Sequence, residues 1–147
     1  MKNFLFLFCL SVFFVSCNDK KKDQEFDYMS ESIEKLVVPM KKCYKNIIVL
    51  PGSGCDGCIS EGETFLAENY KNDEYLFVLT NINSLKIISH KIGIDVTKYS
   101  NIYIDDNNVF SKKNNLIYPL VAFYSCDSTK VSYIKIQKPG NDAFRGL

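Results

Sequence analysis

The feature that most constrains the fold is a pair of cysteines, in Cys55-Asp56-Gly57-Cys58, placed between a predicted strand and a predicted helix. The apolar run at residues 47–50 leads into it through a Pro/Gly-rich turn, and a helical pattern follows. At the start of a helix, free backbone N–H groups and the positive end of the helix dipole stabilise a thiolate, which is the reactive form of cysteine. Cys58 comes one helical turn after Cys55, close enough to close a small disulfide ring. The position therefore indicates a redox pair rather than half of a zinc site.

The first 17 residues have the pattern of a signal segment. Lys2 gives a positive start, and residues 4–15 are almost unbroken apolar, which is too short to span a bilayer well. The run ends at Ser16-Cys17, resembling a bacterial lipoprotein signal in which the cysteine is lipidated and becomes the new N-terminus. Phe14 departs from the leucine most often found there. The alternatives are an ordinary secretory signal with Cys17 incidental and, as the weakest, a retained transmembrane helix.

Export makes disulfides the expected state of the remaining cysteines. Cys9 would leave with the signal and Cys17 would carry lipid, so an even number stays in the folded part: Cys43, Cys55, Cys58 and Cys126.

Charge excludes some classes of partner. The formal net charge is +1 and the basic residues are scattered, so nothing suggests nucleic acid. Arg145 is the only arginine, which argues against a site that clamps phosphates or carboxylates.

The rest of the chain predicts one domain of alternating strands and helices. Residues 18–24 are charged and lack apolar side chains, so we expect a tether there and a domain over residues 25–147. In the helix expected at residues 84–92, Ser84 would cap the first turn and Gly93 would end the helix. In chain order we expect a helix from Glu25 to Pro39, a strand at 47–50, a helix at 58–70, a strand at 75–79, a helix at 84–92, a short strand at 101–104, one helical turn within 109–116, and strands at 120–124 and 131–136.

This order calls for parallel strands joined by crossover helices plus an antiparallel pair. Together with the CxxC pair and with Tyr118-Pro119 before the final hairpin, it resembles the thioredoxin-like plan. It looks most like the membrane-tethered thioredoxin-like lipoproteins of Gram-negative bacteria. The resemblance runs from about Asn46 to Gly140 and leaves the N-terminal helix outside. It implies an α/β three-layer sandwich, a mixed sheet with a βαβ unit and a C-terminal antiparallel hairpin, and a cis-proline at Pro119 facing the cysteines.

The resemblance also implies a function. Cys55 would attack a substrate disulfide, and Cys58 would then resolve the mixed disulfide. Pro119 would keep the backbone beside the sulfurs extended, and a substrate peptide would pair with Tyr118 as an added strand. We therefore expect a monomeric thiol–disulfide oxidoreductase without a cofactor, acting on thiols or disulfides of exported proteins or on a redox relay. Its lipid at Cys17 would hold it to the inner or outer membrane of the cell envelope, with the domain in the periplasm.

Two departures from the family lower the expected reactivity. Gly54 stands where the family usually has tryptophan, and this chain has none. Asp56 puts a carboxylate beside Cys55, which disfavours the thiolate and offsets part of the helix-end effect. We expect a less acidic thiol than in strong oxidases and a disulfide that is harder to reduce. The second hypothesis is a non-catalytic lipoprotein that uses the fold as a binding or structural module.

A second disulfide follows from the same plan. The strand entering the CxxC motif pairs antiparallel with the strand leaving the proline, so if Leu50 lies near Leu120 the paired residue numbers add to about 170. The numbers of Cys43 and Cys126 add to 169. We predict that these two cysteines are neighbours and form a structural disulfide; two unrelated buried thiols are the equally open alternative.

Metal binding is disfavoured. Zinc needs four ligands, and although Cys43, Cys126 and His90 could complete a set, the plan puts both cysteines far from Cys55. We read His90 as a surface or capping residue near a helix end. Residues 105–108 lack the spacing and the distal glutamate of a calcium loop and predict a turn.

Peroxidase chemistry, as in the peroxiredoxin branch of the thioredoxin-like fold, is also disfavoured. Pro51 and Cys58 have its spacing, but Cys55 occupies the position of its hydroxyl residue, and Arg145 alone is available to polarise a peroxide.

Overall fold

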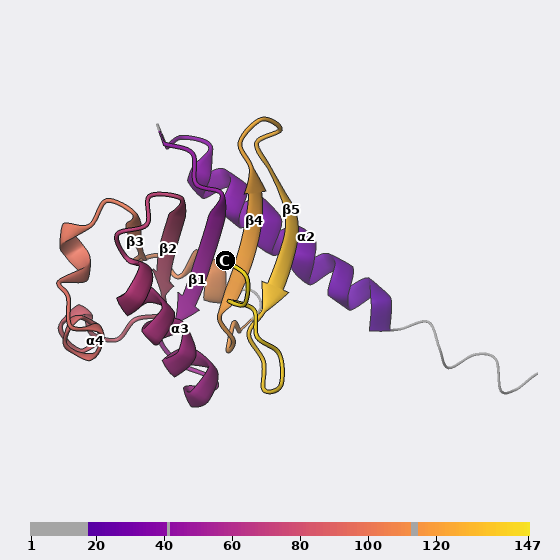
Figure 1. Cartoon of the computed structure of the whole chain (residues 1–147). Helices are drawn as coiled ribbons and strands as arrows, with labels where there is room; N and C mark the ends of the chain where they lie inside the picture. The colour runs from indigo at the N-terminus through magenta and orange to yellow at the C-terminus, as the bar shows by residue number, and fades with distance from the viewer. Residues whose placement is uncertain (1–17, 41, 113–114) are drawn as a thin grey trace, which may run out of the picture.

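A five-stranded mixed sheet forms the centre of the computed structural model, which describes residues 18–40, 42–112 and 115–147. The predicted signal segment and Cys17 lie outside these residues. In sequence order the strands are β1 (Asn46–Pro51), β2 (Tyr75–Thr80), β3 (Ile102–Asp105), β4 (Leu120–Ser125) and β5 (Lys130–Ile136). In the sheet they lie in the order β3-β2-β1-β4-β5 (Figure 1). The first three strands run parallel, and β4 and β5 are antiparallel to their neighbours, so the predicted mixed α/β fold is confirmed.

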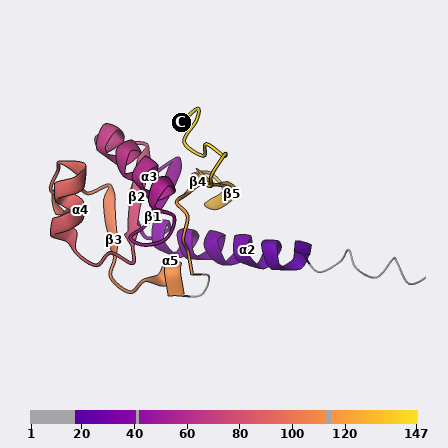
Figure 2. The ribbon, with the colours of Figure 1, turned by 90° about the horizontal axis from the view of Figure 1, so that it is seen from below.

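Helices cover both faces of this sheet. The helices α3 (Asp56–Asn69) and α4 (Leu85–Ile92), with a 3₁₀ turn at Val96–Lys98, connect the parallel strands on one face. The helices α2 (Asn18–Val37) and α5 (Val109–Lys112) lie on the other face (Figure 2). None of the described helices combines the length and the apolar composition needed to cross a bilayer.

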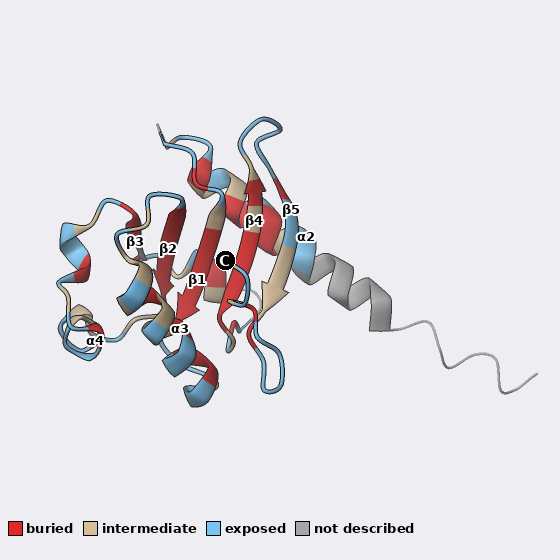
Figure 3. Cartoon of the chain, viewed as in Figure 1, coloured by how far each residue is buried: buried red, intermediate tan, exposed pale blue. Residues whose placement is uncertain are grey.

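The alternation of side chains along β1 builds a core on each face. Ile47 and Val49 pack in the cluster on the α2 face, whereas Ile48 and Leu50 pack in the cluster on the α3 face. All four are almost fully buried, as are the neighbouring parts of β2 and β4 (Figure 3). This two-sided burial explains why β1 is an unbroken apolar run in the sequence.

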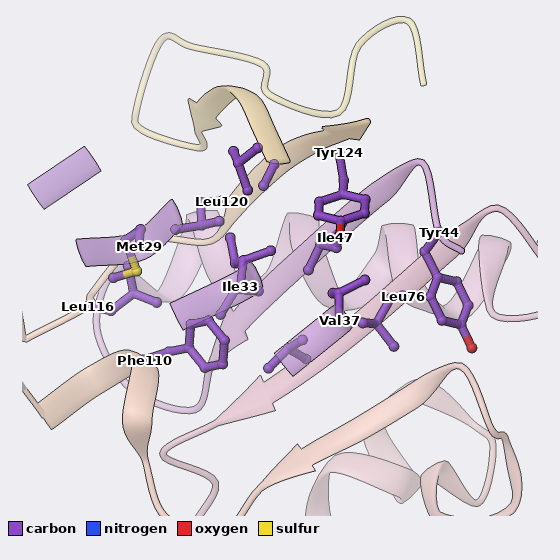
Figure 4. Packing of buried hydrophobic residues seen from close by; sticks show 14 residues of the cluster. Met29, Ile33, Val37, Tyr44, Ile47, Leu76, Phe110, Leu116, Leu120 and Tyr124 are labelled. Atoms are coloured by element: carbon purple, nitrogen blue, oxygen red, sulfur yellow. The ribbon is translucent and has the colours of Figure 1, made fainter. Parts of the chain in front are cut away.

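The helix α2 is longer than its apolar pattern predicts. Met29, Ile33 and Val37 lie on one side of it and pack against the sheet, close to Phe110 and Leu116 (Figure 4). The helix begins at Asn18 rather than near residue 25, so the segment predicted as a tether is the first part of α2. Lysine and glutamine are good helix formers, but the sequence of this segment has no apolar periodicity, and for that reason the pattern did not reveal it.

The boundaries of α4 match the prediction at both ends. Ser84 Oγ accepts a hydrogen bond from Ile87 N–H at 3.3 Å, which caps the first turn. Gly93 ends the helix in the left-handed conformation with φ of 79°.

The register of β1 and β4 brings Cys43 and Cys126 together. Paired residue numbers add to 169 along the ladder, as for Asn46 and Phe123, which confirms the predicted antiparallel register. Cys43 precedes β1 and Cys126 follows β4. Their sulfur atoms lie at disulfide distance and their Cα atoms are 5.9 Å apart. Both residues are exposed, so the picture of two buried thiols does not fit this geometry.

The predicted turn at residues 105–108 contains a buried carboxylate with a structural role. Asp105 is 4 % exposed. It accepts hydrogen bonds from the hydroxyl of Thr80 at 2.8 Å and from the N–H groups of Val109 and Phe110 at 3.0 and 3.1 Å. The carboxylate therefore ties β2 to the start of α5.

We predict that Asp105→Ala lowers the free energy of unfolding by about 2–3 kcal/mol, because it leaves the buried Thr80 hydroxyl and two N–H groups without an acceptor. Urea unfolding measures this loss. Asp106→Ala, at the exposed neighbouring position, is the matched control and should change the stability by less than about 0.5 kcal/mol. Equal effects of the two substitutions would contradict the assigned role.

Candidate functional site

The end of β1 and the start of α3 position the two cysteines. Cys55 is the N-cap residue of α3, with extended backbone angles of φ −74° and ψ 99°. Its carbonyl accepts the N–H of Ile59 at 2.9 Å, but its side chain caps no backbone group, which leaves the sulfur available. Cys58 lies in the first turn of the helix, with a Cα–Cα distance of 5.3 Å to Cys55 and the two sulfurs at disulfide distance. The predicted proximity of the pair is thus present in the structure.

The two cysteines differ in their access to solvent. Both cysteines line one cavity, but Cys55 is half-buried whereas Cys58 is only 4 % exposed. An incoming sulfur can therefore reach Cys55 more readily than Cys58. This asymmetry suits a pair in which one thiol attacks and the other resolves.

The segment before β4 lies directly against the cysteine pair. The N–H of Cys55 donates a hydrogen bond to the carbonyl of Ile117 at 2.9 Å. Pro119 is buried and packs near Gly62 of α3, where an added Cβ would lie 3.3 Å from its ring. The sequence-predicted site residues Cys55, Cys58 and Pro119 are therefore brought to one end of the sheet.

The expected cis-proline is wrong. The described residues contain no cis peptide bond, so the bond between Tyr118 and Pro119 is trans. Trans is the lower-energy isomer of an X–Pro bond. The hydrogen bond from Cys55 to Ile117 holds the segment against the cysteines without a cis bend. The backbone N–H and C=O of Tyr118 form no hydrogen bond within the described part of the chain.

The close approach of Ile117 also explains why residue 54 is a glycine. Its φ is +142°, a conformation that side chains rarely allow. An added Cβ would collide with the Ile117 carbonyl oxygen and would lie 2.6 Å from Ile117 Cα. This close approach is the physical reason why a glycine, and no tryptophan, precedes Cys55 here.

A cavity of about 510 Å³ opens beside the cysteines. One wall comes from α3, through the cysteines, Gly57 and Glu61, and the other comes from the C-terminal segment at residues 137–144. Glu61 is exposed and lies three residues after Cys58, on the same side of the helix. This spacing could have identified Glu61 from the sequence.

Gln137 fixes the C-terminal wall in place. Its N–H donates to the carbonyl of Pro119 at 2.8 Å. Its side chain donates to the carboxylate of Glu61 and accepts from the N–H of Ala143 at 2.6 Å. Gln137 is 5 % exposed, and its hydrogen bond with Ala143 is buried. The sequence carries no local signal for this residue, because all its main partners except Ala143 are distant in the chain.

Charged groups of both signs line the cavity. Glu61 and Asp142 carry carboxylates, and Lys138 Nζ lies 5.6 Å from the centre of the Tyr118 ring.

At the other end of β4, away from this cavity, burial raises the pKa of the Tyr124 phenol, and the negative charge of Glu34 raises it further.

Other polar residues lie away from the cysteine pair. Cys43 and Cys126 are at the opposite ends of β1 and β4. His90 is exposed in the last turn of α4. Among the residues that the structure describes, no group of three or more His, Cys, Asp and Glu is placed to hold a metal ion.

Comparison with known proteins identifies no relative. No protein-family model matches the sequence, no curated protein matches it, and no solved structure matches the fold. A function for the chain must therefore rest on the residues of its own site.

We predict that Gly54→Ala lowers the free energy of unfolding by about 2–4 kcal/mol, because its Cβ forces residue 54 and the Ile117 segment apart. Urea unfolding of the oxidised protein measures the loss. Gly57→Ala is the matched control: its Cβ meets nothing within 4 Å, and alanine favours the helix. The close contact is refuted if both variants are as stable as the wild type.

Proposed function

We propose that the chain is a thiol–disulfide oxidoreductase that exchanges disulfides with exported proteins or with a redox relay. The observation that carries the proposal is the asymmetric pair at the start of α3: both cysteines line one cavity, but Cys55 is half-buried and Cys58, one helical turn later in the sequence, is almost fully buried. The proposal includes a thioredoxin-like fold. The βαβ unit, the antiparallel β4–β5 hairpin and the contact between residue 117 and Cys55 support it.

The exchange takes place in two balanced steps. The Cys55 thiolate attacks one sulfur of a substrate disulfide, a new S–S bond forms, and the second substrate sulfur leaves as a thiolate that takes up a proton. The thiolate of Cys58 then attacks the Cys55 sulfur and releases the first substrate sulfur. Two electrons pass from the protein to the substrate, and the Cys55–Cys58 disulfide remains. The reverse sequence oxidises a dithiol.

The protein environment favours each step. The first N–H groups of α3 lack carbonyl partners within the helix, and with the helix dipole they stabilise negative charge near Cys55. The carboxylate of Glu61, held by Gln137, lines the same cavity and can exchange protons with a departing or arriving thiol. The backbone groups of Tyr118, which have no hydrogen-bond partner in the described part of the chain, offer hydrogen bonds to an extended substrate peptide.

The proposed location follows from the N-terminal sequence. Lipid on Cys17 would anchor the domain to the inner or outer membrane, on the periplasmic side. An oxidising compartment also accounts for two cysteine pairs at disulfide distance. A non-catalytic lipoprotein, with both pairs as structural disulfides, is the competing hypothesis.

We predict that the protein accelerates the reduction of insulin by dithiothreitol and that Cys55→Ser abolishes the acceleration, because Cys58, the other cysteine that lines the cavity among the described residues, is almost fully buried. Turbidity from the released insulin chains measures the rate. The paired variant Cys43→Ser/Cys126→Ser is the control and should keep the activity, since both residues lie at the opposite end of the sheet. No acceleration by folded wild-type protein would support the non-catalytic hypothesis instead.

A further inference from the structure

We call the cavity beside Cys55 and Cys58 the redox cavity. A second cavity lies next to it, on the α2 face of the sheet. It has a volume of about 350 Å³. Its walls come from the side of α2, from residues 115–118, and from β4 and β5, and we call it the α2 groove. The apolar side chains that line it are those of Phe26, Met29, Leu116, Ile117, Leu120, Ile134 and Ile136.

The α2 groove combines a buried apolar floor with an exposed apolar rim. Met29, Leu116 and Leu120 are buried and lie together at one end of the core cluster (Figure 4). Phe26 and Ile117, however, are 38 % and 39 % exposed, so two large apolar side chains of one groove remain in contact with water. An apolar side chain that entered the groove would remove this surface from water.

The α2 groove borders the redox cavity. Lys138 lines both cavities, and its ammonium group lies over the ring of Tyr118, which also lines the α2 groove. At the rim, the carbonyl of Ile117 accepts the N–H of Cys55 at 2.9 Å. A chain that reacts at Cys55 therefore needs to extend by only a few residues to reach the groove.

We propose that the α2 groove binds a large apolar side chain of the polypeptide whose disulfide is exchanged at Cys55. This inference rests on the proposed function and names its substrate class: extended polypeptides with an apolar residue close in sequence to the reacting cysteine. The occupant is a polypeptide because Tyr118 lines the groove, and its backbone N–H and C=O, which form no hydrogen bond within the described residues, can pair with a peptide backbone. The apolar lining selects the side chain.

The test uses short Gly/Ser peptides that each contain one cysteine in a disulfide with glutathione. One series carries a single leucine at successive positions before or after the cysteine, and the reference peptide has serine there. The reduced protein is mixed with each peptide, and chromatography follows the release of the peptide thiol and of glutathione. We expect the wild type to react about tenfold faster with the best leucine peptide than with the reference peptide, because burial of the leucine stabilises the encounter.

Phe26→Ser should remove this preference and leave the rate with the serine peptide unchanged. Tyr133→Ser is the matched control: Tyr133 is an aromatic residue that is 57 % exposed, and it packs against Phe123 on the α3 face, outside the groove. It should keep the full preference.

The outcomes separate this inference from the proposed function. Equal rates of the wild type with all peptides, or an undiminished preference in Phe26→Ser, would overturn the α2 groove as a substrate site while leaving disulfide exchange intact. Exchange with no peptide would overturn both. A wild-type dimer that Phe26→Ser converts to a monomer, without any leucine preference, would assign the groove to a second copy of the chain and overturn the inference.

Discussion

The antiparallel pairing of β1 with β4 determines where both cysteine pairs lie. Antiparallel strands place the end of one beside the start of the other. The pairing therefore sets Cys55, after β1, against residues 117–119, before β4, where the N–H of Cys55 meets the carbonyl of Ile117. At the opposite ends of the same two strands it brings Cys43 next to Cys126. One ladder thus fixes both cysteine pairs, and Gly54 permits the close approach that the ladder requires.

Local signals made much of the fold predictable. The strands could be predicted because they are short apolar runs. The bounds of α4 could be predicted because helix capping depends on side chains that are close in sequence. The β1–β4 register followed from a single assumed pairing, since the numbers of antiparallel partners keep a constant sum. The sequence did not predict the polar start of α2, because that part of the helix has no apolar stripe. It did not predict the cavity wall around Gln137 either, because the hydrogen bonds of Gln137 join segments that are distant in the chain. The cis-proline came from family resemblance and not from this chain's own residues.

Under the proposed function, the site would separate chemistry from recognition. The redox cavity contains the sulfurs and most of the charged groups, whereas the α2 groove on the other side of Tyr118 and Lys138 is mainly apolar. The boundary between them is the short segment before β4, whose backbone contacts Cys55 and whose side chains face the groove. The helix α2, which the family resemblance does not cover, supplies one wall of the groove. Under the proposed function, this helix would therefore take part in selecting the substrate.

The most direct test of this account is the order in which the two cysteines of the reduced pair react. Both cysteines line the same cavity, but Cys55 is half-buried whereas Cys58 is only 4 % exposed. Brief labelling of the reduced, folded protein with iodoacetamide, followed by peptide mass mapping, measures both rates at once. The account predicts that Cys55 is modified at least about tenfold faster than Cys58, because access and the helix N-terminus both favour its thiolate. Equal rates, or faster modification of Cys58, would contradict it.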